Sequence, residues 1–112
     1  MSYKIVPTDN FSRELKRLSK KYPSLKQKIK EFSDELLNNP KMGTSIGHNC
    51  YKVRVSTHDK SGGKSKGFRI ITYVVSKKEI IFLLSIYDKS EISTLKDWEI
   101  KRIIKGLDKT TF

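Results

Sequence analysis

The chain has 112 residues, with 24 Lys or Arg against 12 Asp or Glu, so its formal net charge is +12. A single domain of this length, residues 1–112, buries about 65% of its unfolded surface without a disulfide staple, and no apolar run approaches the roughly 18 residues that span a bilayer. The lone Cys50 cannot form an intrachain disulfide, and the first ten residues lack the apolar region of a signal peptide, so we expect a cytoplasmic protein.

The N-terminal part of the chain predicts one strand and two amphipathic helices. Residues 3–6 predict a short strand that Pro7 ends, and Thr8 or Asp9 can cap the helix that follows. In each helix, apolar residues recur at spacings of 4, 3 and 4 on one face: Phe11, Leu15, Leu18 and Tyr22, then Leu25, Ile29, Phe32 and Leu36. Because the turn at Pro23 is short, we expect an antiparallel helix hairpin with a shared apolar face.

Three strands are predicted after a polar loop. Residues 51–56 alternate apolar with polar side chains, which predicts a strand with one buried face. Residues 57–67, with the sequence THDKSGGKSKG, form a basic, glycine-rich loop. Residues 68–75 and 79–87 are almost continuously apolar, as expected of central strands covered on both faces, and residues 76–78 join them by a tight hairpin turn.

The last predicted element is a helix that begins at a capping box of Thr94 and Asp97 and ends at Gly106. The predicted order is therefore β-α-α-β-β-β-α, without repeats or a linker. Three consecutive hairpin-linked strands imply a small antiparallel meander sheet packed on its helices, so the fold class is α+β.

The excess positive charge predicts a polyanionic partner, and RNA, DNA and an acidic protein all fit. We expect no membrane partner, because no basic segment has the Trp, Phe and Leu face of an interfacial helix. Lys52 and Arg54 lie two apart on a strand, Arg69 lies in the next strand and Lys89 follows the last one, so the four cations can converge. A solvated face would explain the first two equally well, but a guanidinium in an apolar strand is costly, so Arg69 needs a partner or a purpose.

Other motifs carry no comparable signal. Gly63-Lys64-Ser65 lacks the first glycine of a phosphate-binding P-loop, since His58 stands there, and the loop joins two strands. His48, Cys50 and His58 are irregularly spaced and have no fourth His or Cys ligand, so we expect no metal and no cofactor. No serine lies in a nucleophile elbow.

Three sequence blocks stand in a distinctive order. They are YKVRV at 51–55, GFRIITY at 67–73 after the basic loop, and IFLLSIYDKSE at 81–91 before the last helix. This order resembles the RelE/ParE toxin superfamily and is closest to its HigB- and RelE-like mRNA interferases. The resemblance implies the toxin of a type II toxin–antitoxin system, a metal-independent, ribosome-dependent endoribonuclease that cleaves mRNA in the A site and so inhibits translation.

The resemblance also implies that the active-site cations are Lys52, Arg54, Arg69 and Lys89. Cleavage by the 2′-OH of RNA needs a proton acceptor, charge stabilisation of a phosphorane and a proton donor for the leaving 5′-oxygen. We expect Arg54 and Arg69 to stabilise the phosphate and Lys52 or Lys89 to move protons, since like-charge neighbours make a lysine easier to deprotonate. His58 is a reserve candidate, because the ordinary pKa of histidine suits proton transfer.

The sequence departs from the family at the start of the last helix and near the C-terminus. A tyrosine that some members carry at the start of the last helix is absent, where Ser93, Thr94 and Leu95 stand, and so are the C-terminal histidines of other members. The resemblance implies that the partners are an acidic antitoxin of the helix-turn-helix type, ribosomal RNA and mRNA, with operator DNA bound only through the antitoxin. We expect three lysines of the basic loop to bind RNA: Lys60, Lys64 and Lys66.

Two other functions stay open. ParE-like toxins of the same fold inhibit DNA gyrase without cleaving RNA, although that branch generally lacks the four cations. A non-catalytic nucleic-acid-binding protein would need only dispersed charge for its phosphate contacts, and it would leave Arg69 unexplained.

Overall fold

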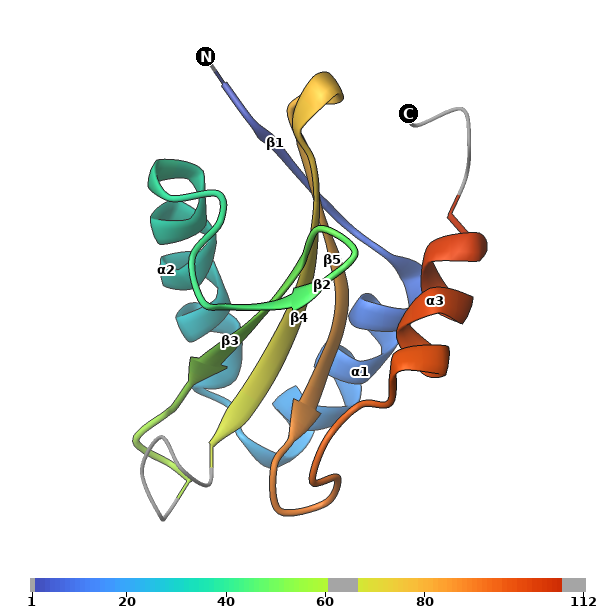
Figure 1. Ribbon diagram of the computed structural model, residues 1–112. Helices are drawn as coiled ribbons and strands as arrows, with labels where there is room; N and C mark the ends of the chain where they lie inside the picture. Colours follow the sequence, from blue (N-terminus) through green and yellow to red (C-terminus); the bar gives the residue numbers. More distant parts are fainter. Residues whose placement is uncertain (1, 61–66, 108–112) are drawn as a thin grey trace.

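The strands in the described part of the chain form one five-stranded sheet of order β1-β5-β4-β3-β2, shown in Figure 1. This is a computed structural model, and it describes residues 2–60 and 67–107. The strands are β1 (Lys4–Pro7), β2 (Thr44–Gly47), β3 (Cys50–Val55), β4 (Phe68–Val75) and β5 (Ile80–Asp88). Neighbours from β2 to β5 are antiparallel, which confirms the predicted meander, whereas β1 runs parallel to β5 and makes the sheet mixed. The predicted α+β class is confirmed.

Strand β2 was predicted as loop and is the one additional strand in the described chain. Its residues are exposed except for the half-buried Ile46, so it lacks the apolar alternation that marks a strand. A turn through His48 and Asn49, both with positive φ, returns the chain into β3. Such a turn matches the twist of the strands that it joins.

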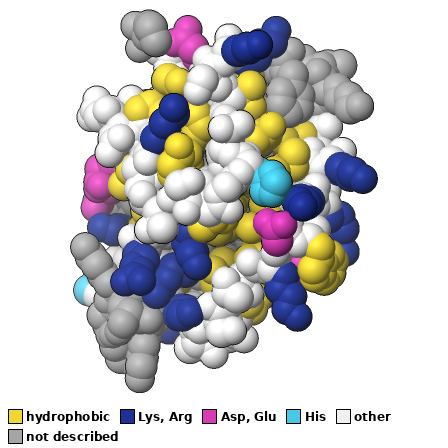
Figure 2. All heavy atoms as spheres, in the orientation of Figure 1, with side chains coloured by type: hydrophobic (Ala, Val, Ile, Leu, Met, Phe, Trp, Pro, Cys, Tyr) yellow, Lys and Arg dark blue, Asp and Glu magenta, His cyan; other side chains and the backbone are white. Residues whose placement is uncertain are grey.

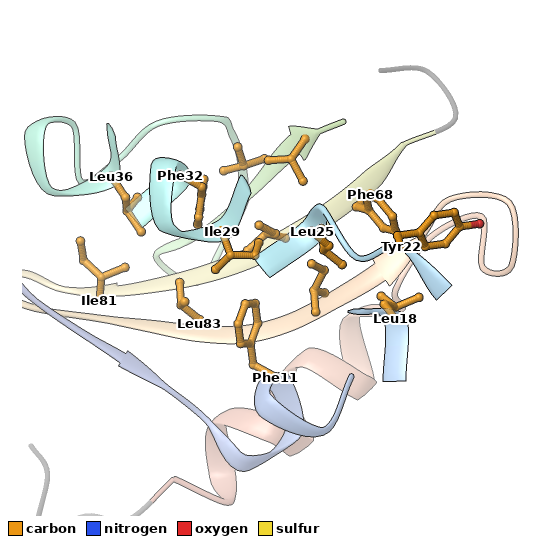
Figure 3. Packing of buried hydrophobic residues seen from close by; sticks show 14 of the residues in the cluster. Phe11, Leu18, Tyr22, Leu25, Ile29, Phe32, Leu36, Phe68, Ile81 and Leu83 are labelled. Atoms are coloured by element: carbon orange, nitrogen blue, oxygen red, sulfur yellow. The ribbon is translucent and has the colours of Figure 1, made fainter. Parts of the chain in front are cut away.

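Helices α1 (Asp9–Lys21) and α2 (Leu25–Asn38) pack on one face of the sheet, as predicted. The Thr8 side chain accepts a hydrogen bond from the backbone N–H of Phe11 at 3.1 Å and caps α1. The apolar stripes of both helices meet residues of β3, β4 and β5 in the larger hydrophobic core (Figure 3). Each fully buried side chain of this kind contributes about 1.5–3 kcal/mol.

Helix α3 (Asp97–Lys105) covers the opposite face of the sheet (Figure 1). It begins at Asp97 and not at the predicted Thr94, and Lys96 is its N-cap residue. The Glu99 side chain in the first turn accepts a hydrogen bond from the backbone N–H of Lys96 at 3.2 Å, so the cap does not involve Thr94. Its apolar side meets β4 and β5 through Ile100. No helix in the described part of the chain is both long and apolar enough to cross a bilayer.

A bulge in β5 sets the direction of the residues that follow it. The register with β4 passes from Ile71–Ser85 to Thr72–Leu83, which leaves Leu84 without a partner in β4. On the α1 side, the Glu14 carboxylate accepts from the hydroxyl of Ser85 at 2.9 Å and from the next backbone N–H at 3.1 Å. The bulge brings both Leu84 and Tyr87 to the face that α3 covers.

Candidate functional site

Three of the four predicted cations lie on adjacent strands and on one face of the sheet. Arg54 of β3 stands directly opposite Arg69 of β4, and Lys52 lies two residues before Arg54 on the same side of β3. The alternate residues of β3, Val53 and Val55, point instead into the core under α1 and α2. The register of the strands therefore brings Lys52, Arg54 and Arg69 together on one surface of the sheet, the one that α3 covers.

Arg69 is the buried member of this group, with 4% of its surface exposed. Its guanidinium donates to the carbonyl of Phe68 at 3.2 Å. Burial, and secondly the charge of Arg54, lowers the pKa of Arg69. Like charges directly opposite each other repel across a strand pair, and an anion bound over Arg54 and Arg69 would be attracted to both.

Lys89 joins the group from the end of β5. Its backbone N–H donates to the carbonyl of Gly67 at 3.0 Å, which extends the pairing of β4 with β5 by one residue. Its ammonium group donates to the carbonyl of Ser93, in the segment that leads into α3. This places the Lys89 side chain on the α3 side of the sheet. Tyr87, two residues earlier, lies on the same side, as expected when side chains alternate along a strand.

The turn that carries Lys89 is fixed by a buried ion pair. Asp88 is 1% exposed, and Lys60 places its ammonium 3.1 Å from the Asp88 carboxylate. The backbone N–H and the hydroxyl of Ser90 donate to the same carboxylate at 2.9 and 2.7 Å. The ammonium of Lys60 also lies 5.4 Å from the centre of the Tyr22 ring, whose hydroxyl points away from the other labelled side chains in Figure 3 and donates to the Asp88 carboxylate at 3.4 Å.

This pairing changes the expectation for the basic loop. Lys60 was predicted to bind RNA, but its side chain is 8% exposed and neutralises Asp88, so we do not retain it among the RNA-facing cations. Lys64 and Lys66 lie outside the described residues. The neighbouring His58 lines a hollow beside Ser24 and Gln27 of the α2 region, and not the α3 face.

Among the described residues, no acidic side chain neutralises the remaining cations of the group. Between described residues, no ion pair involves Lys52, Arg54 or Lys89. Figure 2 shows Lys and Arg side chains gathered on the lower half of the face that carries β2. Within residues 2–60 and 67–107, no three His, Cys, Asp or Glu side chains are grouped to hold a metal ion, and Cys50 is buried. Because no ion pair between described residues involves Lys52, Arg54 or Lys89, this group of cations can offer concentrated positive charge to a phosphate.

Sequence reasoning overlooked Tyr87, which stands opposite Arg69 on β5. It is 1% exposed, and its hydroxyl has no hydrogen-bond partner in the described structure. The sequence pattern places it only at the end of an apolar strand. The signal that could have found it is its register with Arg69, which depends on the bulge at Leu84.

Comparisons with known proteins agree with this architecture. The sequence model of the family described as ParE toxin of type II toxin-antitoxin system, parDE, matches residues 5–92. The structure is similar to a free double Arg-to-Ala variant of the E. coli toxin RelE, with a TM-score of 0.62, 20% identity and coverage of 96% of this chain and 100% of that chain. For the isolated E. coli RelE toxin the TM-score is 0.60 and the identity 17%, with coverage of 94% and 99%. For a chain of the intact E. coli RelBE toxin–antitoxin complex these values are 0.59, 18%, 77% and 95%.

Proposed function

Since the chain belongs to the RelE/ParE superfamily of type II toxin–antitoxin toxins, we propose that it is a ribosome-dependent endoribonuclease that cleaves mRNA in the ribosomal A site. The observation that carries this proposal is the convergence of Lys52, Arg54, Arg69 and Lys89 on one face of the sheet. Cations grouped on one face can stabilise the charge that develops on a phosphate, and a toxin that acted only by covering a protein surface would not need such a group.

In the proposed reaction, the 2′-oxygen of the RNA attacks the adjacent phosphorus. The new 2′-O–P bond forms as the P–O5′ bond breaks, which gives a 2′,3′-cyclic phosphate and a free 5′-hydroxyl. The proton of the 2′-OH passes to a basic group, and a second group protonates the leaving 5′-oxygen. Arg54 and Arg69 stabilise the charge that develops on the phosphorane, and Lys52 and Lys89 are the proton-transfer groups.

The two arginines have different surroundings and therefore different parts in this scheme. Arg54 is exposed and can contact the phosphate directly. Arg69, at 4% exposure, adds positive charge from beneath, where water and salt screen it less. The remaining surface lysines favour docking on ribosomal RNA through phosphate contacts.

The proposed protein partner is an acidic antitoxin of the helix-turn-helix type. The net charge of +12 favours a partner of opposite sign, and the similar E. coli RelE is found in a complex with its antitoxin RelB. Operator DNA would be bound only through this antitoxin.

The site is tested with single alanine variants on translating ribosomes. Removal of one stabilising donor from such a site lowers the rate by about 10²–10³-fold, so we expect this loss in Arg54→Ala and in Lys89→Ala. Lys30→Ala is the matched control, because Lys30 is an exposed lysine of α2 and its loss changes the net charge equally. Cleavage by both site variants at the rate of the control would overturn the site assignment.

The second candidate function is inhibition of DNA gyrase. The match of residues 5–92 to the ParE family model favours it. It predicts that Arg54→Ala and Lys89→Ala leave toxicity unchanged and that the purified chain blocks supercoiling by gyrase. Labelling of cells that express the chain distinguishes the two, because the ribonuclease stops translation first and the gyrase inhibitor stops replication first.

A further inference from the structure

The outer face of α3 carries an aromatic side chain within a row of basic ones. Four exposed residues, spaced as on one side of a helix, make up this α3 row: Trp98, Lys101, Arg102 and Lys105. Ile100, which packs against the sheet, lies on the opposite side of the helix. The α3 row therefore points away from the sheet and its cation group, and Trp98 keeps 58% of its surface exposed. Figure 2 shows hydrophobic surface between Lys and Arg side chains on the side where α3 lies.

Arg102 connects the α3 row with a cleft between two helices. Its guanidinium lies 5.2 Å from the centre of the Trp98 ring, a cation–π contact that fixes the indole beside this arginine. The cleft lies between the start of α1 and the last turns of α3, has a volume of about 570 Å³, and is lined by Arg102 and by Arg13 of α1. Between described residues no ion pair involves either arginine, and Asp9 is the one acidic residue among the described residues of the lining. Two helices thus present cations without an acidic partner to one cleft, next to the indole.

This combination of groups fits a nucleic acid. A single exposed aromatic side chain needs no explanation by itself. In the α3 row, however, an indole on which a base can stack lies among cations that can bind the phosphates on either side of that base. The indole is reached only by a base that is not already stacked in a duplex, so the strand must be unpaired there. An acidic protein would pair with the same cations and is the competing partner.

We propose that this surface docks the protein on ribosomal RNA, with an unpaired base stacked on Trp98 and a neighbouring phosphate bound by Arg102 and Arg13. The inference rests on the proposed function, because the ribosome supplies the RNA, and it names a contact outside the four cations of the candidate site. Helix α3 adjoins that site through the segment that the Lys89 ammonium contacts. Ribosomal RNA around the A-site codon is therefore within reach of the outer face of α3 while the mRNA lies at the site.

Trp98 is the only tryptophan of the chain, so its fluorescence reports on this surface alone. The full chain is titrated with a short, unstructured oligoadenylate and with inorganic polyphosphate at equal phosphate concentration. We expect the RNA to quench the fluorescence by stacking, and polyphosphate, which has the charge but no bases, to quench it far less. In Arg102→Ala and in Arg13→Ala, the slope of log K against log salt concentration should fall by about 0.7, as for one lost phosphate contact to a single strand. Lys30→Ala, an exposed lysine of α2, is the matched control and should keep the wild-type slope.

Ribosomes provide the second test. Trp98→Leu keeps an apolar side chain without an aromatic face, so it should weaken co-sedimentation with ribosomes about tenfold and raise the KM for ribosomes equally, with kcat unchanged. Trp98→Tyr keeps a ring and should bind nearly as the wild type does, and Leu37→Ala, which truncates an exposed apolar side chain of α2, is the matched control.

Equal quenching by polyphosphate and RNA, or wild-type affinity of Trp98→Leu for ribosomes, would overturn the inference while cleavage stands. Loss of antitoxin binding in Trp98→Leu with ribosome binding unchanged would overturn it in favour of a protein partner. If the wild type binds ribosomes but cleaves nothing, the proposed function fails, and the ribosome affinity of Trp98→Leu still decides whether this surface binds ribosomal RNA.

Discussion

Replacing Lys60 by Met removes the ammonium that neutralises Asp88 and lies over the rings of Tyr22 and Phe68, and it leaves an unbranched apolar side chain in place. In the wild type the two charged atoms are 3.1 Å apart, and the side chains are 8% and 1% exposed. Loss of one member of a buried ion pair costs about 3–5 kcal/mol, because the other charge stays buried without its partner. Since Asp88 keeps two hydrogen bonds from Ser90, we expect Lys60→Met to lose about 3 kcal/mol, the lower end of that range.

The assay is urea unfolding followed by circular dichroism, applied to Lys60→Met, Asp88→Asn and the double variant. The double variant should lose less than the sum of the single losses, by about 2 kcal/mol, because the two groups act as a pair. The matched control is Lys30→Met, which replaces an exposed lysine and should stay within about 0.5 kcal/mol of the wild type.

The loss should also depend on pH. Burial alone would raise the pKa of Asp88, but hydrogen bonds from Ser90 and the charge of Lys60 hold this pKa below its ordinary value. The stabilisation is therefore complete above the unfolded-state pKa of about 3.9 and is lost as the pH falls through the lower folded-state pKa. We expect the penalty of Lys60→Met to shrink below about pH 4. A loss under about 0.5 kcal/mol at pH 7, or strictly additive single variants, would refute this reasoning.

Three further predictions concern a partly buried carboxylate, two glycines with positive φ and a buried thiol. Burial raises the pKa of Glu14, so the ionised carboxylate destabilises the native state at pH 7. Glu14→Gln keeps an acceptor oxygen without the charge and should therefore raise the urea midpoint at pH 7. This gain should vanish as the pH falls through the raised pKa, because the wild-type carboxyl then becomes protonated. Gly43 has φ of +97°, and a Cβ there would lie 2.6 Å from the Lys52 carbonyl oxygen, so Gly43→Ala should cost about 2 kcal/mol or more in urea unfolding. Gly47 has φ of +87° but open space around it, so Gly47→Ala should cost about 1 kcal/mol. Equal losses in the two variants would contradict the steric argument. Burial raises the pKa of Cys50 to about 11, so a disulfide reagent at pH 8 should label the unfolded chain quickly and the native chain hardly at all, whereas rapid native labelling would contradict the burial of the thiol.

The elements that local patterns define are predicted well. The 4-3-4 spacing from Phe11 to Leu36 predicted both helices of the larger core, and the apolar runs of β4 and β5 predicted the two central strands. Strand β2 escaped prediction because Ile46 is its only apolar residue. The parallel pairing of β1 with β5 joins residues that are far apart in the chain, and no local period encodes such a contact.

In the candidate site, too, some residues could be placed from the sequence and others could not. Alternation along β3 and the hairpin to β4 were enough to place Lys52, Arg54 and Arg69 on one face, because both depend on neighbouring residues. The partner of Lys60 could not be predicted, since Asp88 lies at the end of a different strand and looks in the sequence like a surface residue. Tyr87 was missed for a related reason, because a bulge decides which face it occupies.

Cleavage mapping with purified components tests the central claim most directly. The chain is added to ribosomes that hold an mRNA with an empty A site, the mRNA ends are mapped by primer extension, and the same RNA without ribosomes serves as the control. The account predicts cuts within the A-site codon, a 2′,3′-cyclic phosphate on the upstream fragment and an intact RNA in the control. Intact mRNA on the ribosome, together with blocked supercoiling when the same preparation is added to DNA gyrase, would contradict it.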